Sequence, residues 1–415
     1  MRRMNGATFR LVLMVSCAHS LVHVYEQSLA SVEQLVVADP AFGISGGPAE
    51  QAEVSGWLGN CLRMPFGFCG LLAGWLADRF GAKRLLLVYL LGCSAAALLA
   101  WFAPGLAMIF VSMFALGLFC SIYHPAGVGL ITHHTTPENR PMALGYHGIF
   151  GSMGIAAGPF LAGLVLSTGV TWREYYLVVA LPGVLLAAFF FLRLRRREEQ
   201  STDRRENSSS GDGEDTAYWR SYFTLMMSAG MAGIVYAAIL HFLPRYLGEA
   251  GLTFGDLPPE STRNYLAAGV LLLGMFGQYT GGRLARPTTL EPLMAATFFA
   301  AAPCVLWMGF AEGSARILAA ALFSPLFFMH QPLFNSLVAK YVPRRRRSLC
   351  YGLSFTVGFG VGSFGPAFAG YVESDPLKFG ILAGILVVVG CLSLVLWRWH
   401  GPVSGAGDET EEALV

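Results

Sequence analysis

Long apolar runs separated by short polar segments make up most of this chain. Twelve such runs are each close to, or longer than, the roughly 20 residues that a helix needs to cross the hydrocarbon core of a membrane. Strands in lipid would leave backbone groups unpaired, so we predict that every run is a helix. The predicted spans are about 9–37, 54–78, 84–103, 106–132, 141–168, 175–192, 220–248, 263–285, 289–311, 314–341, 347–371 and 376–399.

A polar segment over residues 193–219 divides these spans into two groups of six. It is rich in charged residues, Ser and Gly and has no hydrophobic period, a composition typical of a solvated linker. We therefore predict an all-α membrane protein with two six-helix bundles, 1–192 and 220–400. The tail 401–415 has a similar composition and is expected to be disordered and cytoplasmic.

The two predicted bundles are related in sequence. Repeated halves place a solute site near the middle of the membrane, between the halves, and move solute by rocking one half against the other. We therefore expect two pseudo-symmetric bundles with a path between them. At a constant offset of 207 residues the matches are Gly74 with Gly281, Arg79 with Arg286, Pro125 with Pro332, Arg140 with Arg347, Gly145 with Gly352, Gly158-Pro159 with Gly365-Pro366 and Gly163 with Gly370.

The charges agree with a membrane location and indicate the orientation. Of the 415 residues 54% are hydrophobic and only 13% are charged, whereas about a quarter of a soluble domain is charged. With the N-terminus inside, 22 of the 28 Lys and Arg residues fall on the cytoplasmic side, five outside and one, Arg63, within a span. Positive residues favour the cytoplasmic side, so we predict that both termini are cytoplasmic, in a bacterial inner membrane. The eight cysteines lie in or beside apolar runs and are expected to be packing residues.

The loop between the second and third spans carries a recognisable motif, Gly-Trp-Leu-Ala-Asp-Arg-Phe-Gly-Ala-Lys-Arg over residues 74–84. It resembles the signature loop of the major facilitator superfamily, which implies a secondary transporter of two six-helix bundles. We expect Gly74 to allow close helix approach and Asp78 to cap or pair with cations when the cytoplasmic side is shut. The second copy, at residues 281–286, lacks the acid. The residues expected to form this cytoplasmic gate are Gly74, Asp78, Arg79, Gly81, Lys83 and Arg84.

Shorter segments are similar to the fosmidomycin-resistance type of efflux protein: residues 18–21, 121–127 and 151–159. The resemblance implies export, although the fourth span lacks the buried Arg that many drug–proton antiporters carry. The Gly-Pro pair of the fifth span recurs in the eleventh, which favours a packing feature of both repeats over an antiport marker. The expected packing residues are Gly154, Gly158, Pro159, Gly365 and Pro366.

Ionisable residues at membrane depth are costly and are usually functional. At 100° per residue His19, His23, Glu26 and Glu33 share one stripe of the first span about 80° wide, which must face a cavity or a partner helix. At about 1.5 Å per residue, Glu26 lies about 16 Å and Arg63 about 14 Å from the outer ends of their spans. We expect these two to form an ion pair, either as a static strut or in coupling and binding. Glu33, nearer the interface, is expected to be solvated.

The same span offers a metal-binding alternative, because two His four residues apart with a Glu are suitable ligands. Nothing else nearby in the sequence completes such a site, so we expect no metal and no cofactor. The remaining candidates for the inner half of the cavity are Tyr123, His124 and His147, mirrored on the tenth span by His330, Gln331 and Asn335. The alternative for these residues is interhelical hydrogen bonding around Pro125 and Pro332. On the seventh span His241 and Arg245 share a face at the outer mouth, where Arg245 is expected to anchor at the interface.

These observations favour a secondary active transporter that moves a small solute by alternating access, with proton-coupled export as the leading hypothesis. Metabolite uptake by symport or uniport and a non-transporting membrane sensor are the alternatives. No nucleotide-binding or catalytic motif has a supporting context, so we do not expect an enzyme. The expected partners are a small-molecule substrate, protons and the lipid bilayer, with no nucleic acid and a monomeric chain.

Overall fold

The computed structural model describes residues 4–136, 139–198, 217–343 and 346–400, and every regular element among them is helical. In chain order the helices are α1 (Gly6–Val37), the 3-10 turn η1 (Pro40–Phe42), α2 (Gly47–Phe68), α3 (Gly70–Phe80), α4 (Ala82–Trp101), α5 (Leu106–Cys120), α6 (Tyr123–His133), α7 (Arg140–Leu166), α8 (Trp172–Glu198), α9 (Trp219–Gly248), α10 (Pro259–Leu284), α11 (Leu290–Met308), α12 (Ala315–Phe328), α13 (His330–Tyr341), α14 (Arg347–Gly362), α15 (Phe364–Tyr371) and α16 (Asp375–His400).

Consecutive helices join into rods at the positions of the predicted spans, which confirms the all-α prediction. Nine of the described helices or continuous helix pairs are long and apolar enough to cross a membrane. The rods α2–α3, α10 and α14–α15 complete the set of twelve at lower hydropathy. Helix α8 runs to Glu198, six residues into the segment predicted to be a linker. The rest of that segment, residues 199–216, and the tail 401–415 lie outside the described residues.

Three of the rods are broken at prolines. A proline has no backbone N–H, and its ring clashes with the carbonyl of the residue four positions earlier. Pro125, Pro332 and Pro366 lie four residues after Ser121, Phe328 and Gly362, which are the points where α5, α12 and α14 end or have just ended. The first two breaks are related by the offset of 207 residues, so the repeat read from the sequence extends to a matching break in both halves.

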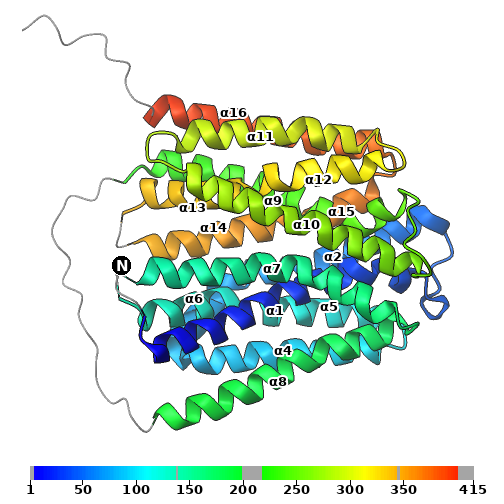
Figure 1. Cartoon of the computed structure of the whole chain (residues 1–415), viewed down its shortest axis with the longest axis horizontal. Coiled ribbons are helices and arrows are strands. Elements are labelled where there is room, and N and C mark those ends of the chain that lie inside the picture. Colours follow the sequence, from blue (N-terminus) through cyan, green and yellow to red (C-terminus); the bar gives the residue numbers. More distant parts are fainter. Residues whose placement is uncertain (1–3, 137–138, 199–216, 344–345, 401–415) are drawn as a thin grey trace, which may run out of the picture.

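Helices α1–α8 and α9–α16 form two halves that lie side by side (Figure 1). One apolar cluster is built from residues between Leu11 and Phe190. A second is built mainly from residues between Tyr222 and Leu396, together with Ile155 and neighbouring Ala156 of α7. We call the end where α1 begins and α16 ends the terminal side, on the left of Figure 1, and the opposite end the distal side.

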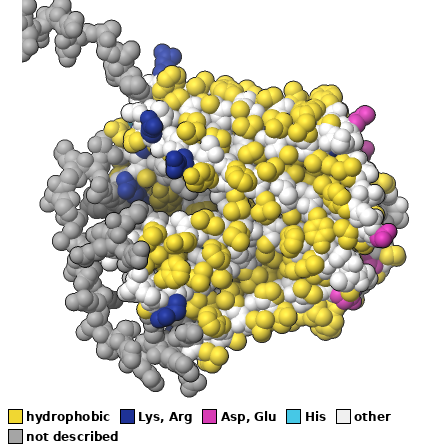
Figure 2. Space-filling view, in the orientation of Figure 1, with side chains coloured by type: hydrophobic (Ala, Val, Ile, Leu, Met, Phe, Trp, Pro, Cys, Tyr) yellow, Lys and Arg dark blue, Asp and Glu magenta, His cyan; other side chains and the backbone are white. Residues whose placement is uncertain are grey.

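The surface between these two ends is apolar. Figure 2 shows hydrophobic side chains over the whole middle of the visible face, with Lys and Arg near the terminal side and Asp and Glu near the distal side. Large exposed side chains in this region include Phe276 at 68% and Leu185 at 60% exposure. Apolar exposure on this scale matches a chain whose surface faces lipid, with its charges at the two interfaces.

The glycines predicted to be packing residues make matching contacts in the two halves. A Cβ added at Gly158 of α7 would lie 2.6 Å from the Cβ of Gln27 on α1. At the same offset, a Cβ at Gly365 of α15 would overlap the backbone oxygen of Ile234 on α9. Gly154 similarly abuts the backbone of Ser20. These glycines let α7 approach α1, and α15 approach α9, more closely than any larger residue would allow.

Candidate functional site

The two halves meet along a seam formed by α1, α2, α3 and α7 on one side and α9, α10, α14 and α15 on the other. On the distal side this seam is tightly packed. A Cβ at Gly56 of α2 would overlap the backbone of Pro366, and one at Gly370 of α15 would overlap the backbone of Ala52. The close contact reaches as far as Gly67, near the middle of the seam, where a Cβ would overlap the backbone of Gly360. A Cβ at Gly163 of α7 would lie 2.9 Å from the ring of Tyr265 on α10. Glycine therefore lets the two backbones touch over the distal half of the seam.

Polar contacts also join the halves on the distal side. Glu33 of α1 accepts two hydrogen bonds from Arg245 of α9, from Nε at 2.9 Å and from an Nη at 2.5 Å. Glu33 is 1% and Arg245 16% exposed in its side chain. Three further bonds cross the seam nearby: Ser55 with His241 Nε2 at 3.0 Å, Asn60 donating to the Ser363 carbonyl at 3.0 Å, and Asn264 donating to the Ser31 carbonyl at 2.8 Å.

Two expectations for this region are wrong. Glu33 is buried rather than solvated, and Arg245 binds it rather than anchoring at the interface. Both residues lie within four positions of the distal ends of α1 and α9. Their similar depth in the membrane is a feature of the sequence from which this ion pair could have been predicted. A cavity of about 260 Å³ reaches Arg245 from the distal side and is also lined by Gln34, Glu249 and Arg263.

The terminal half of the seam is packed less closely. A Cβ added at Gly145 or Gly148 of α7 would meet nothing within 4 Å. One at Gly352 of α14 would lie 3.6 Å from Leu71, and one at Gly70 would lie 3.7 Å from Thr356, which are ordinary contact distances. The seam is therefore shut on the distal side and loose on the terminal side.

One chain of polar side chains crosses the seam nearer the terminal side. Ser152 of α7 donates to the Gln278 side chain of α10 at 2.5 Å. Gln278 in turn donates to Gln331 of α13 at 2.7 Å. Gln331 is therefore linked to the seam through Gln278 of its own half.

The signature loop lies at this loose end. Asp78 is exposed, and among the described residues no ion pair involves it. Arg79 lies over the ring of Trp75, 5.4 Å from its centroid. Gly81 joins α3 to α4 with φ of +89°, a conformation that favours glycine. A Cβ at Gly74 would lie 3.6 Å from Pro125, so the close approach expected there is not required in this form of the protein. Lys83 and Arg84 lie in the first turn of α4.

The predicted Glu26–Arg63 ion pair is confirmed and lies in the middle of the first half. Arg63 donates to Glu26 Oε1 at 2.5 Å, and His23 Nδ1 donates to Glu26 Oε2 at 2.7 Å. The Arg63 guanidinium also lies 5.5 Å from the ring centroid of Tyr236 on α9, so the pair faces the other half. A second nitrogen of Arg63, Nη2, is buried and has no hydrogen-bond partner in the part of the chain that the structure describes. The pair is a charged contact at the seam with a free donor.

Further polar rings extend this pair along α1 toward the terminal side. His19 Nδ1 donates to the His147 carbonyl at 2.7 Å, and the two rings stack at 3.9 Å. Tyr123 donates to the Val15 carbonyl at 2.7 Å, with its hydroxyl 3.0 Å from His147 Nε2. His124 lies 5.2 Å from His19 and 5.1 Å from Phe355 of α14, measured between ring centroids. The structure thus brings together seven of the predicted site residues: His19, His23, Glu26, Arg63, Tyr123, His124 and His147.

The second half does not repeat this cluster. At the offset of 207, Glu26 corresponds to Gly233 and Arg63 to Val270. His330 packs against the rings of Phe298 and Phe327, at 5.3 and 4.7 Å, and its Nδ1 donates to the Phe327 carbonyl. The structure therefore places His330 inside its own half, against the expectation that it mirrors the first half at a cavity. Asn335 is exposed on α13, and His241 belongs to the distal contacts.

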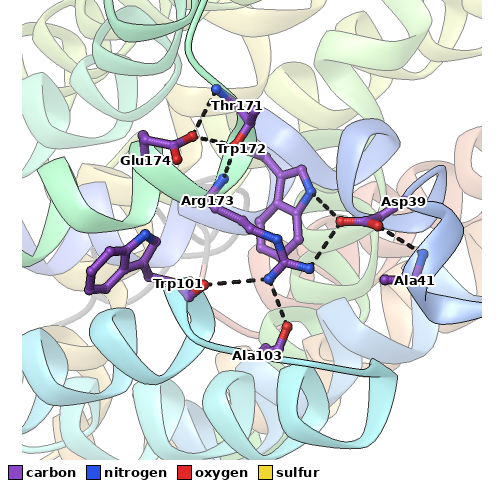
Figure 3. A network of polar contacts seen from close by, with 8 residues as sticks. All are labelled: Asp39, Ala41, Trp101, Ala103, Thr171, Trp172, Arg173 and Glu174. Atoms are coloured by element: carbon purple, nitrogen blue, oxygen red, sulfur yellow. Dashed lines mark hydrogen bonds and ion pairs between the residues drawn. The ribbon is translucent and has the colours of Figure 1, made fainter.

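A separate polar network holds the distal end of the first half together (Figure 3). Asp39 accepts from Arg173 and from the Trp172 indole, both at 3.1 Å. Arg173 also donates to the Ala103 carbonyl at 2.7 Å and stacks on Trp172 at 4.3 Å. These contacts join the distal ends of α1, α4 and α8 and do not cross the seam. They therefore provide a control within one half for the distal contacts that do cross it.

The sequence is similar to that of a large transporter family. The family model described as Major Facilitator Superfamily matches residues 41–366. The chain is 36% identical over 132 residues to the puromycin resistance protein pur8 of Streptomyces alboniger, covering 32% of this chain and 26% of that one. It is 29% identical over 140 residues to a probable actinorhodin transporter of Streptomyces coelicolor, covering 32% and 24%. It is 30% identical over 115 residues to the probable sulfoacetate transporter SauU of Cupriavidus necator, covering 28% and 26%.

The matched regions of these curated relatives make up about a quarter of each relative's length. Solved structures resemble the fold over nearly the whole chain. The inward open xylose transporter XylE from E. coli has a TM-score of 0.73 at 12% identity, covering 96% of this chain and 97% of that one. A bacterial homolog of the human lysosomal transporter Spinster, in an inward-facing and unoccupied conformation, has a TM-score of 0.70 at 13% identity, covering 96% and 98%.

Proposed function

Because this chain belongs to the major facilitator superfamily, we propose that it is a secondary active transporter that exports a small solute by alternating access. The observation that carries this proposal is the asymmetry of the seam. Glycine contacts and the Glu33–Arg245 pair shut it on the distal side, while the terminal side has ordinary or open spacing. A path that is shut at one end and loose at the other is one of the two states that alternating access requires.

We also propose that the terminal side faces the cytoplasm. Figure 2 shows Lys and Arg near that side of the visible face, and positive residues favour the cytoplasmic side of a membrane. In this orientation both termini are cytoplasmic, the membrane is the inner membrane of a bacterium, and the described form is shut toward the outside and loosely packed toward the cytoplasm. The unpaired Asp78 is consistent with this assignment, because a cytoplasmic gate would close only in the other state.

The polar cluster of the seam supports a role in recognition. These groups are buried in the described form. When the seam parts further from the terminal side, a solute would meet the Glu26 carboxylate, the rings of His19 and His23, and Nη2 of Arg63, which has no hydrogen-bond partner among the described residues. A buried carboxylate and guanidinium are costly unless they stay paired or gain new partners, so a polar group of a solute at this position is favoured. A carboxylate and imidazoles can bind and release protons, and we propose the proton as the driving ion.

The relatives support export as the direction. One is named a puromycin resistance protein and another a tetracenomycin C resistance and export protein. We therefore propose that the solute is a small organic compound of the kind that these names describe. The sulfoacetate transporter relative keeps uptake of a small metabolite as the alternative.

Transport in membrane vesicles tests this function. Puromycin, actinorhodin, tetracenomycin C and sulfoacetate would be offered to inside-out vesicles with an acidic lumen, with vesicles that lack the chain as the control. Accumulation of at least one compound, abolished by a protonophore, is expected. Accumulation only in right-side-out vesicles would replace export by uptake. Movement of none of the compounds in either orientation, by folded protein, would contradict the proposed class of solute.

A further inference from the structure

Three histidines of the first half have the arrangement of metal ligands. His19 and His23 lie one turn apart on α1, and His124 lies on α6. One ring nitrogen from each can be chosen so that all three lie within 4.8 Å of one another. Bond lengths of about 2.0–2.1 Å to a tetrahedral Zn²⁺ place two ligand nitrogens about 3.3 Å apart. Ring movements of about 1.5 Å or less would therefore bring all three nitrogens onto one ion.

The hydrogen bonds of His19 and His23 use one nitrogen of each ring, Nδ1, and among the described residues none is made by Nε2. His19 Nδ1 lies 2.7 Å from the His147 carbonyl, which can only accept, so Nδ1 carries the proton. His23 Nδ1 lies 2.7 Å from Glu26 Oε2, and Glu26 is paired with Arg63, so this Nδ1 donates as well. In neutral rings both Nε2 atoms then carry a lone pair. A carbonyl or a carboxylate on the second ring nitrogen is the usual support of a metal-ligating histidine.

His124 supplies a third ligand from outside α1. Its Nε2 is buried, and no hydrogen bond to it is present among the described residues. A buried polar atom without a partner costs about 1–3 kcal/mol, and a bound cation would remove this cost. The break between α5 and α6 lies at Ser121 and Ile122, and His124 lies in the first turn of α6, directly before Pro125. The proline that breaks the rod therefore also restricts the backbone at this ligand.

The surrounding charges and rings define the class of ion. Glu26 binds His23 through one oxygen and Arg63 through the other, so the guanidinium charge is compensated. Imidazole nitrogens suit Zn²⁺, Co²⁺, Ni²⁺ and Cu²⁺, whereas Mg²⁺ and Ca²⁺ require oxygen ligands. Three histidines leave a fourth tetrahedral position open, as in sites that exchange a ligand.

We propose that the seam binds one late first-row divalent cation through His19, His23 and His124, with the fourth position open to water or to a donor atom of the solute. Phe355 and Phe359 of α14 lie 5.1 and 6.2 Å from the His124 ring and cover it from the second half. Opening of the seam therefore controls access to the ion. The inference goes beyond the proposed function, because ion binding requires no transport.

Metal titration of the purified full-length chain tests this site, using a preparation without a polyhistidine tag. Co²⁺ alone is the spectroscopic probe and Zn²⁺ alone the competitor. One equivalent of Co²⁺ is expected to give the intense visible absorption of a tetrahedral site, and Zn²⁺ is expected to displace it. Absence of this spectrum with folded wild-type protein at millimolar Co²⁺ would overturn the proposal without any variant.

Variants then assign the ligands. His19→Gln, His23→Gln and His124→Gln are each expected to weaken Zn²⁺ binding by at least about 100-fold, and Glu26→Gln, which removes the support of His23, by about 10–100-fold. His241→Gln and His330→Gln are the matched controls at membrane depth and are expected to leave the affinity unchanged. Binding that survives the first three substitutions but is lost with His133→Gln would overturn the site. A chain that transports without binding metal refutes this inference alone, and one that binds without transporting refutes the proposed function alone.

Discussion

The Glu33–Arg245 contact gives a direct test of how the distal side is held shut. We consider Glu33→Gln, which removes the charge and leaves Arg245 partly buried in the same cavity as Arg263. Arg263 is another guanidinium, with one nitrogen that has no hydrogen-bond partner among the described residues. Hydrogen bonds to charged groups contribute about 1.5–3 kcal/mol each. Arg245 lines the distal cavity and regains water when the pair breaks, so we expect a net loss of about 2 kcal/mol rather than the full value of both bonds.

This loss acts on the equilibrium between the two states of the seam. Since about 1.4 kcal/mol corresponds to a factor of ten, 2 kcal/mol raises the population open on the distal side by roughly 30-fold while that form remains minor. Ser55 is fully buried in the distal seam, 3.0 Å from His241. Ser55→Cys, in a background lacking the native cysteines, reports this opening through its rate of reaction with a membrane-impermeant maleimide. We expect the rate to rise roughly 30-fold in Glu33→Gln.

The matched control is Asp39→Asn. It also removes a charged contact at the distal end, with Arg173 and Trp172 at 3.1 Å, but all three residues belong to the first half (Figure 3). Labelling of Ser55→Cys should therefore stay at the parental rate in this variant. Equal labelling in the two variants, or no change in Glu33→Gln, would refute the reasoning that the pair across the seam holds this end closed.

Three further predictions concern stability in detergent, measured by thermal and denaturant unfolding. Glu26→Gln should lower the free energy of unfolding by about 3 kcal/mol, because Arg63 is left buried and unpaired. The double variant with Arg63→Gln should lose less stability than the sum of the two single changes. Additive losses of stability would contradict a direct pair. Gly365→Ala should lower the free energy of unfolding by about 1–3 kcal/mol, because its Cβ would overlap a backbone oxygen. Gly145→Ala, whose Cβ would meet nothing within 4 Å, should leave the free energy of unfolding unchanged. Equal losses of stability in the two variants would show that the close contact at Gly365 is absent. Asp78→Asn should change stability by less than about 0.5 kcal/mol, because its side chain is exposed and free of ion pairs among the described residues; a larger loss would place a partner on it.

The sequence was sufficient for the spans and for contacts within one half. The apolar runs predict the number and position of the helices, because a segment of about 20 residues crosses lipid as a helix with its backbone groups paired. Three of the twelve rods, α2–α3, α10 and α14–α15, have lower hydropathy than the other nine. The Glu26–Arg63 pair followed from equal depth on neighbouring helices. Sequence reasoning did not foresee that Pro125 and Pro332 would break their rods, although the loss of a backbone hydrogen bond at proline is a local effect that a sequence can reveal.

Contacts between the halves could not be derived in the same way. Glu33 and Arg245 are 212 residues apart, and their meeting depends on how two separately folded halves dock. The third histidine of the candidate metal site was missed for a related reason, since His124 reaches His19 only through the packing of α6 against α1. The repeat misled at His330, where the ring fills a space between Phe298 and Phe327 in its own half. Sequence symmetry predicts backbone position well and side-chain environment poorly.

The central claim is that the two halves rock about the seam, and paired spin-label distances test it most directly. One pair would join exposed Glu53 of α2 to exposed Glu373 after α15 on the distal side, and another would join exposed Arg79 of α3 to exposed Leu349 of α14 on the terminal side. With Glu33→Gln as the trigger, the account predicts that the distal distance lengthens while the terminal distance shortens in the same population of molecules. Distances that stay fixed, or that lengthen together, would contradict it.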